Sequence, residues 1–196
     1  MDLVNNLETF ADIAKAKAFL GREFLTWLWY VAESRSDAFA VAISDKESLE
    51  IRVWVDDRMV LESTDNGTHS MKGGRPGQSP EAAISLRNGK SVSDIKVGID
   101  IAHWGAFTAT IDHRDLTPRG IKLPVDDPEQ MAAAAPADEP PMERRLHLTG
   151  IFLAVIDGLF QDFLDHRTRD SWQEDGLEPM RAWIRERYQE SAAVYH

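Results

Sequence analysis

Residues 19–30, Phe-Leu-Gly-Arg-Glu-Phe-Leu-Thr-Trp-Leu-Trp-Tyr, concentrate aromatic side chains in a chain that is only 9% aromatic. Apolar side chains recur here every three or four residues, as at Phe24 and Trp27, which is the period of an amphipathic helix. Trp29 and Tyr30 fall on other faces, so this helix is apolar most of the way round. Such a helix is buried between two layers or is shared with a partner. We therefore expect a central helix with a sheet on one side.

An alternating pattern replaces the helical period after this stretch. Residues 38–43 are typical of a strand, and residues 49–55 alternate apolar and polar side chains as a half-buried strand does. The pair Asp56-Asp57 predicts a turn, with a return strand at residues 59–61. A short strand is expected near residues 69–72.

A short helix interrupts these strands. Ser79 is its expected N-cap, and Asn88-Gly89 is expected to end it. Two long strands follow at residues 92–101 and 104–111, and an extended segment covers residues 120–123. The predicted fold class is α+β: an antiparallel β-meander interrupted by a short helix, packed with the central aromatic-rich helix and long C-terminal helices.

Helical patterns flank the strands. Residues 1–18 predict either a separate first helix or an extension of the central one. Pro, Ala and acidic residues fill the stretch before the C-terminal helices, a composition typical of linkers. The predicted organisation is an α+β core domain at 1–123, a linker at 124–141 and a C-terminal helical segment at 142–196, with helices at 143–172 and 177–194.

Composition limits the classes of function. The chain has 196 residues and a formal net charge of −11, which argues against general adhesion to a polyanion. Residues 126–196 hold 7 basic and 15 acidic side chains, a net charge of −8. Residues 67–122 hold 8 basic and 5 acidic side chains, a net charge of +3. The middle of the chain is therefore the expected segment for any contact with nucleic acid.

The expected location is cytoplasmic. The chain has no cysteine, which excludes disulfides and Cys-ligated metal sites and fits a reducing compartment. The first residues lack the basic region and apolar core of a signal peptide. The longest apolar run, residues 151–160, is too short to cross a bilayer and contains Asp157.

No catalytic motif stands out. The 6 histidines lack metal-ligand spacing, and His113 is expected in a solvated turn. Asp94 and Lys96 share one face of a strand, so a metal-dependent nuclease site with Asp56 or Asp57 is a minor alternative. We predict no catalytic residue, no cofactor and no bound metal.

Several segments in order resemble the recombination-associated protein RdgC family. No single segment is catalytic, and the resemblance lies in the order in which they follow one another over roughly residues 19–166. The segments are Leu20–Tyr30, Val53–Ser63, Ser79–Lys90, Leu116–Pro124 and Leu148–Gly150.

The resemblance implies a non-enzymatic, oligomeric protein that binds double-stranded DNA without sequence preference and limits the access of a recombinase to DNA. On that basis the chain would be nucleoid-associated. The family's N-terminal portion has no counterpart here, so either another polypeptide supplies it or this shorter chain has lost DNA binding. The basic residues in the resembling region, expected to contact phosphates, are Lys72, Arg75, Arg87, Lys90, Lys96, Arg114, Arg119 and Lys122.

The alternative hypothesis is an acidic protein–protein interaction module. It would dock on a partner protein, or on a second copy, through an exposed aromatic face of the central helix or through the last helix. The residues expected at that interface are Phe24, Trp27, Trp29, Tyr30, Trp183 and Tyr188.

Overall fold

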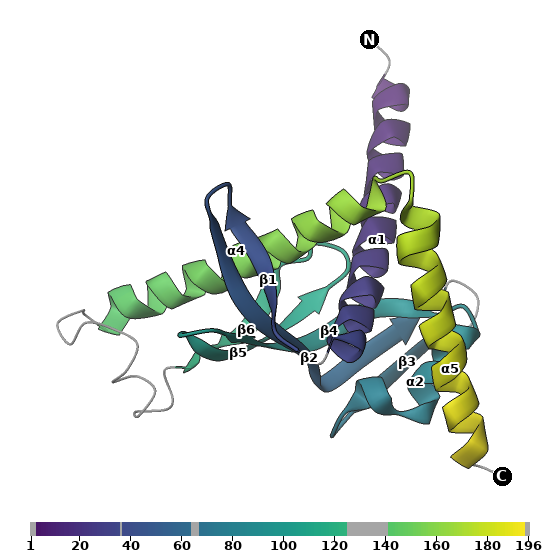
Figure 1. Cartoon of the computed structure of the whole chain (residues 1–196). Helices are drawn as coiled ribbons and strands as arrows, with labels where there is room; N and C mark the ends of the chain where they lie inside the picture. The colour runs from purple at the N-terminus through teal and green to yellow at the C-terminus, as the bar shows by residue number, and fades with distance from the viewer. Residues whose placement is uncertain (1–2, 36, 64–66, 125–140, 195–196) are drawn as a thin grey trace.

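The computed structural model describes residues 3–35, 37–63, 67–124 and 141–194 of the chain. It confirms the predicted α+β class, because one antiparallel sheet packs with long helices (Figure 1). The elements are α1 (Leu3–Ser34), β1 (Phe39–Ser44), β2 (Glu47–Glu62), β3 (Thr68–Lys72), the 3-10 turn η1 (Pro76–Gln78), α2 (Pro80–Arg87), β4 (Ser91–Ile101), β5 (Gly105–Asp112), β6 (Pro118–Lys122), α4 (Pro141–Arg167), the π-helical turn η3 (Gln173–Leu177) and α5 (Glu178–Val194).

The sheet is a meander built around the long strand β2. Its strand order is β1-β2-β4-β5-β6, and every neighbouring pair is antiparallel. β1 pairs with the first part of β2, and β3 pairs with residues 58–62 at its other end. The predicted helix after β3 is confirmed, since the Ser79 hydroxyl accepts a hydrogen bond from the backbone N–H of Ala82.

One predicted turn is wrong. The sequence predicted a turn at Asp56-Asp57, but β2 runs continuously through this point. Residues 56–58 form a bulge opposite Lys96 alone. The bulge adds an even number of residues, so Val55 before it and Met59 after it both point to the buried face. The two aspartates therefore lie in a bulge within a continuous strand and do not end it.

The central helix α1 is continuous from Leu3 to Ser34, so residues before 19 extend it. Its C-terminal half packs on β4 and β2, while Figure 1 shows its first turns extending beyond the other elements. Gly21 lies in the middle of this helix, against the backbone carbonyl of His113. A Cβ at this position would overlap that carbonyl oxygen, so glycine permits the close approach of helix and strand.

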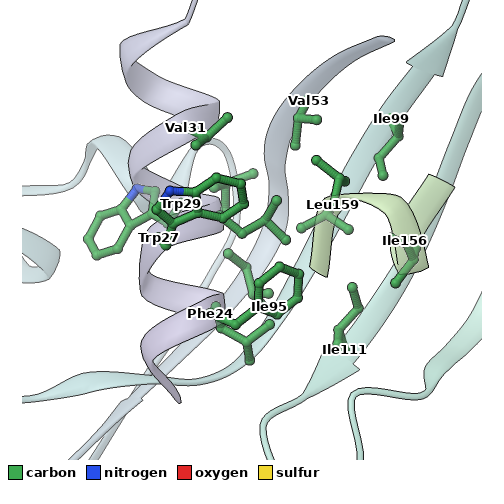
Figure 2. Close-up of a cluster of buried hydrophobic side chains, with 14 of the residues drawn as sticks. Phe24, Trp27, Trp29, Val31, Val53, Ile95, Ile99, Ile111, Ile156 and Leu159 are labelled. Atoms are coloured by element: carbon green, nitrogen blue, oxygen red, sulfur yellow. The ribbon is translucent and has the colours of Figure 1, made fainter. Parts of the chain in front are cut away.

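The hydrophobic core lies between the sheet and two helices, α1 and α4 (Figure 2). The ring of Phe24 on α1 lies 5.1 Å from that of Phe160 and 5.6 Å from that of Phe163 on α4. Phe152 stacks on Phe107 of β5 at 5.4 Å. The C-terminal helix thus shares one core with the sheet, although the sequence analysis set it in a separate segment. The predicted linker falls almost entirely outside the described residues.

Helix α4 is also long and apolar enough, by length and composition, to cross a membrane over Met142–Arg167. In this structure its buried row, which includes Leu148, Phe152 and Leu159, packs against the sheet. Gly158 lies against Ala42 of β1, where a Cβ would overlap the backbone carbonyl oxygen. This packing involves one side of the helix, and 33% of the apolar window is buried.

Candidate nucleic-acid interface

The sheet has one covered face and one open face. Inward side chains such as Val53, Ile95 and Ile99 are buried under α1 and α4. The side chains between them point the other way and are exposed or half-buried, which is the alternation expected of a sheet covered on one side. We call this second surface the open face. It includes Arg52, Trp54, Asp56, Asp57, Arg58, Lys72, Asp94, Lys96, Asp100, Thr108, Thr110, Asp112, Arg119 and Lys122.

The β2 bulge surrounds Lys96 with carboxylates. The Lys96 Nζ lies 2.9 Å from Asp56 Oδ2 and 2.9 Å from Asp57 Oδ1. These hydrogen bonds raise the pKa of Lys96 above its usual value, and the same contact lowers the pKa of Asp57. The positive charge of Lys96 is therefore largely offset by its own chain.

A second charged group lies beside this cluster. Arg58 Nε is 3.0 Å from Asp94 Oδ1, and Asp94 lies directly across from Asp112 on β5. Burial raises the pKa of Asp94; the Arg58 charge opposes this rise and the Asp112 charge adds to it. The open face thus intersperses both signs of charge.

The residues named for the minor nuclease alternative lie close together in the structure. Asp57, Asp94 and Lys96 all lie on the open face, although Asp57 was predicted to lie in a turn. Each carboxylate, however, already pairs with a basic side chain. Within the described ranges, no group of three His, Asp or Glu side chains is placed to hold a metal ion.

His113 is buried, and the expectation of a solvated turn is wrong for its side chain. Its Nδ1 lies 2.9 Å from the backbone carbonyl oxygen of Ser93, which it faces across the bulged end of β4. Together with the Gly21 contact, this places His113 in the seam between α1 and the sheet.

The predicted phosphate contacts divide into two groups: four lie on the open face and four lie away from it. Lys72, Lys96, Arg119 and Lys122 lie on the open face. Arg87 lies away from the open face, because its guanidinium stacks over the Tyr188 ring of α5 at 3.8 Å. The remaining residues lie in connections: Arg75 precedes η1, Lys90 precedes β4 and Arg114 lies in the β5–β6 turn.

The open-face cations differ in their pairing. Lys96 is paired with Asp56 and Asp57, and Arg119 is paired with Asp115. Lys72 and Lys122 are exposed and make no ion pair with any residue in the described part of the chain. These two lysines are therefore the side chains most available to a phosphate.

The predicted aromatic interface is wrong for the central helix. Phe24, Trp27 and Trp29 are buried in the core, so they offer no exposed aromatic face. Trp183 of α5 packs edge-on against Trp29, with ring centroids 5.0 Å apart, and also against the half-buried Tyr30. The last helix therefore docks on α1 within the same chain, and the aromatic stretch is explained by the core.

Trp54 was expected on the outer side of its strand but was not named as a candidate site residue. The alternation of Val53 and Val55 with Trp54 was the signal, because buried neighbours on both sides put the indole on the opposite face. Gly98 of β4 lies directly across, and its missing side chain makes room for the ring.

No family model matches this chain, and no curated protein matches it either.

Proposed function

We propose that this chain is a non-enzymatic, RdgC-like protein that associates weakly with DNA, without sequence preference, through the open face. The observation that supports the proposal is the gathering of Lys72, Lys96, Arg119 and Lys122 from three strands on the uncovered side of one sheet. Arg52 and Arg58, which the sequence analysis did not include, lie on the same side. Phosphate contacts from such a surface position a protein on DNA and carry no sequence information.

The acidic side chains of the open face limit the strength of this association. Lys96 and Arg119 are already paired, which leaves Lys72 and Lys122, together with the exposed Arg52, as the main phosphate contacts. Two to four neutralised phosphates correspond to a salt slope of about −2 to −4 on duplex DNA. The proposed role is to modulate recombination by limiting access to DNA near the nucleoid, and the resemblance to RdgC in sequence order supports it.

Charge reversal tests this proposal. The double variant Lys72→Glu/Lys122→Glu should lose most retention of a labelled DNA duplex at about 50 mM salt, where phosphate contacts are strongest. Its matched control is Arg145→Glu/Arg169→Glu, which changes the net charge equally with two exposed residues of α4 and the turn after it. Equal loss in both variants would mean that only the net charge matters, and no loss in either would remove the open face as the interface.

A second candidate function is self-association, which the outer face of α4 favours. Met142, Leu146 and Leu153 are 67%, 62% and 39% exposed. Spacings of four and seven residues place them in one row, the pattern by which two helices pair. Beside the row, a groove of about 370 Å³ is lined by Trp104, His147 and other residues. We propose α4 of a second copy as the occupant.

The two candidates make different predictions for one variant. Leu146→Glu/Leu153→Glu should convert a dimer to a monomer in sedimentation while leaving the open face intact. A wild-type chain that sediments as a monomer at high concentration would dispose of the second candidate and leave the first unaffected.

A further inference from the structure

Trp54 is the tryptophan of the open face, and its indole has no aromatic partner. Its side chain is half-buried and lies outside the hydrophobic core that takes in Trp27, Trp29 and Trp172. Within the described residues it makes no ring–ring or cation–π contact. An aromatic ring that the core does not use is available to a ligand.

The ring lies against Gly98 of the neighbouring strand. A Cβ on Gly98 would overlap the ring atoms Cε2 and Cζ2 and lie close to Nε1. Because atoms of both indole rings cover one backbone position, one face of the ring rests on the strand. The opposite face points away from the sheet, and glycine is what allows this flat position.

An ammonium group lies at the far end of the row that begins at Trp54. The directly opposed residues are Trp54 on β2, Gly98 on β4, Thr108 on β5 and Lys122 on β6. Neighbouring strands lie about 4.8 Å apart, so Trp54 and Lys122 are about 14 Å apart along the row. The Thr108 hydroxyl oxygen is buried and has no hydrogen-bond partner within the described ranges, so the accessible groups of the row are the Trp54 ring and the Lys122 ammonium.

The acidic residues flank this row and do not interrupt it. Asp56 follows Trp54 by two residues on β2, and Asp100 follows Gly98 by two on β4, so they lie on opposite sides. Lys122 lies at the far end of the row and makes no ion pair in the described part of the chain, although its charge contributes to the lowered pKa of Asp57. A strand of phosphates can therefore pass over β5 and β6 while a base reaches Trp54.

We propose that Trp54 is a stacking site for an unpaired nucleobase, so that the open face binds single-stranded DNA in preference to a duplex. This inference rests on the proposed DNA association and names its substrate. A base stacks on an indole whatever its sequence, but it must be out of the double helix to do so. Lys122 then contacts the sugar-phosphate backbone of the same strand.

The first test uses the unchanged protein. We would measure fluorescence anisotropy with a labelled oligothymidylate of about 20 nucleotides, a length that covers several base contacts. An abasic strand of the same length and charge is the comparison. The thymine-bearing strand should bind about 5- to 150-fold more tightly, the range expected for one stacked base. Equal affinities would overturn the stacking site while leaving charge-driven association intact.

Two variants then locate the effect. Trp54→Leu keeps an apolar cover over Gly98 and should bring oligothymidylate affinity down to that of the abasic strand, with duplex affinity unchanged. Trp54→Phe keeps an aromatic ring and should retain most of the preference. If both variants keep the preference for the thymine-bearing strand, the assignment to Trp54 is overturned.

Two further outcomes would also overturn the inference. If the wild-type chain binds neither the single strand nor the duplex at low salt, the proposed function fails with it. If Trp54→Leu changes the oligomeric state and leaves all DNA affinities unchanged, the open face is a protein contact and not a base-stacking site.

Discussion

Gly21 of α1 lies so close to the backbone carbonyl of His113 that a single methyl group at this position would overlap its oxygen. This contact fixes the distance between the central helix and the end of β5. Backbone atoms on both sides leave little room for adjustment.

The contact predicts that Gly21→Ala destabilises the protein. Overpacking of this kind costs about 1–3 kcal/mol. Alanine is otherwise preferred to glycine inside a helix by about 1 kcal/mol. Gly150 of α4 provides the control, because a Cβ there meets nothing within 4 Å. Chemical denaturation should show Gly150→Ala stabilised and Gly21→Ala destabilised. The same sign for both variants would contradict the packing described here.

A second prediction concerns the place of α4 in the core. Phe163 is fully buried against Phe24, Trp27 and Trp172, so Phe163→Ala should lower the free energy of unfolding by about 3–5 kcal/mol. Leu153→Ala on the same helix should change it by less than about 1 kcal/mol, because that side chain is 39% exposed. Urea denaturation of both variants measures the difference. Similar small losses would mean that α4 is not part of a shared core.

Much of the fold could be predicted from local patterns. The capped helix at Ser79 and the strand pair on either side of His103 depend on residues close together in sequence, and both are confirmed. The turn at Asp56-Asp57 was wrong because turn-forming residues also suit a bulge, and only the pairing with β4 distinguishes the two. Local chemistry cannot specify that pairing.

The candidate site was harder to predict, for a physical reason. Sequence could list the basic residues but could not decide their partners, so Lys96 was expected to contact phosphates although two aspartates hold it. The alternative hypothesis assigned the aromatic residues of α1 to a surface, because no local signal shows that α4 and α5 cover them. Trp54 was overlooked because its importance depends on Gly98, which is 44 residues away in the chain (98 − 54).

The third prediction concerns pH. Asp94 has a raised pKa in the folded protein, so its charged form disfavours folding. The stability from this group is fully present below its ordinary value of 3.8 and is lost as the pH rises through the raised value. Asp94→Asn should therefore gain stability relative to the wild type as the pH rises through this window.

Asp115 supplies the opposite case for the same titration. A hydrogen bond from the backbone of Thr117 and the contact with Arg119 lower its pKa, so its contribution is present above 3.8 and lost as the pH falls through the lowered value. Asp115→Asn should lose stability relative to the wild type as the pH rises. Thermal denaturation across the acid range measures both slopes. Parallel slopes for the two variants would contradict the assigned environments.

The salt dependence of duplex binding tests the central claim most directly. The affinity of the wild-type chain for a labelled duplex should fall about 10- to 150-fold between about 50 and 200 mM salt, as two to four phosphate contacts require. The logarithmic slope should become shallower in Lys72→Glu/Lys122→Glu. Binding that does not depend on salt, or no retention at the lower salt concentration, would contradict the proposal that the open face of this sheet associates with DNA.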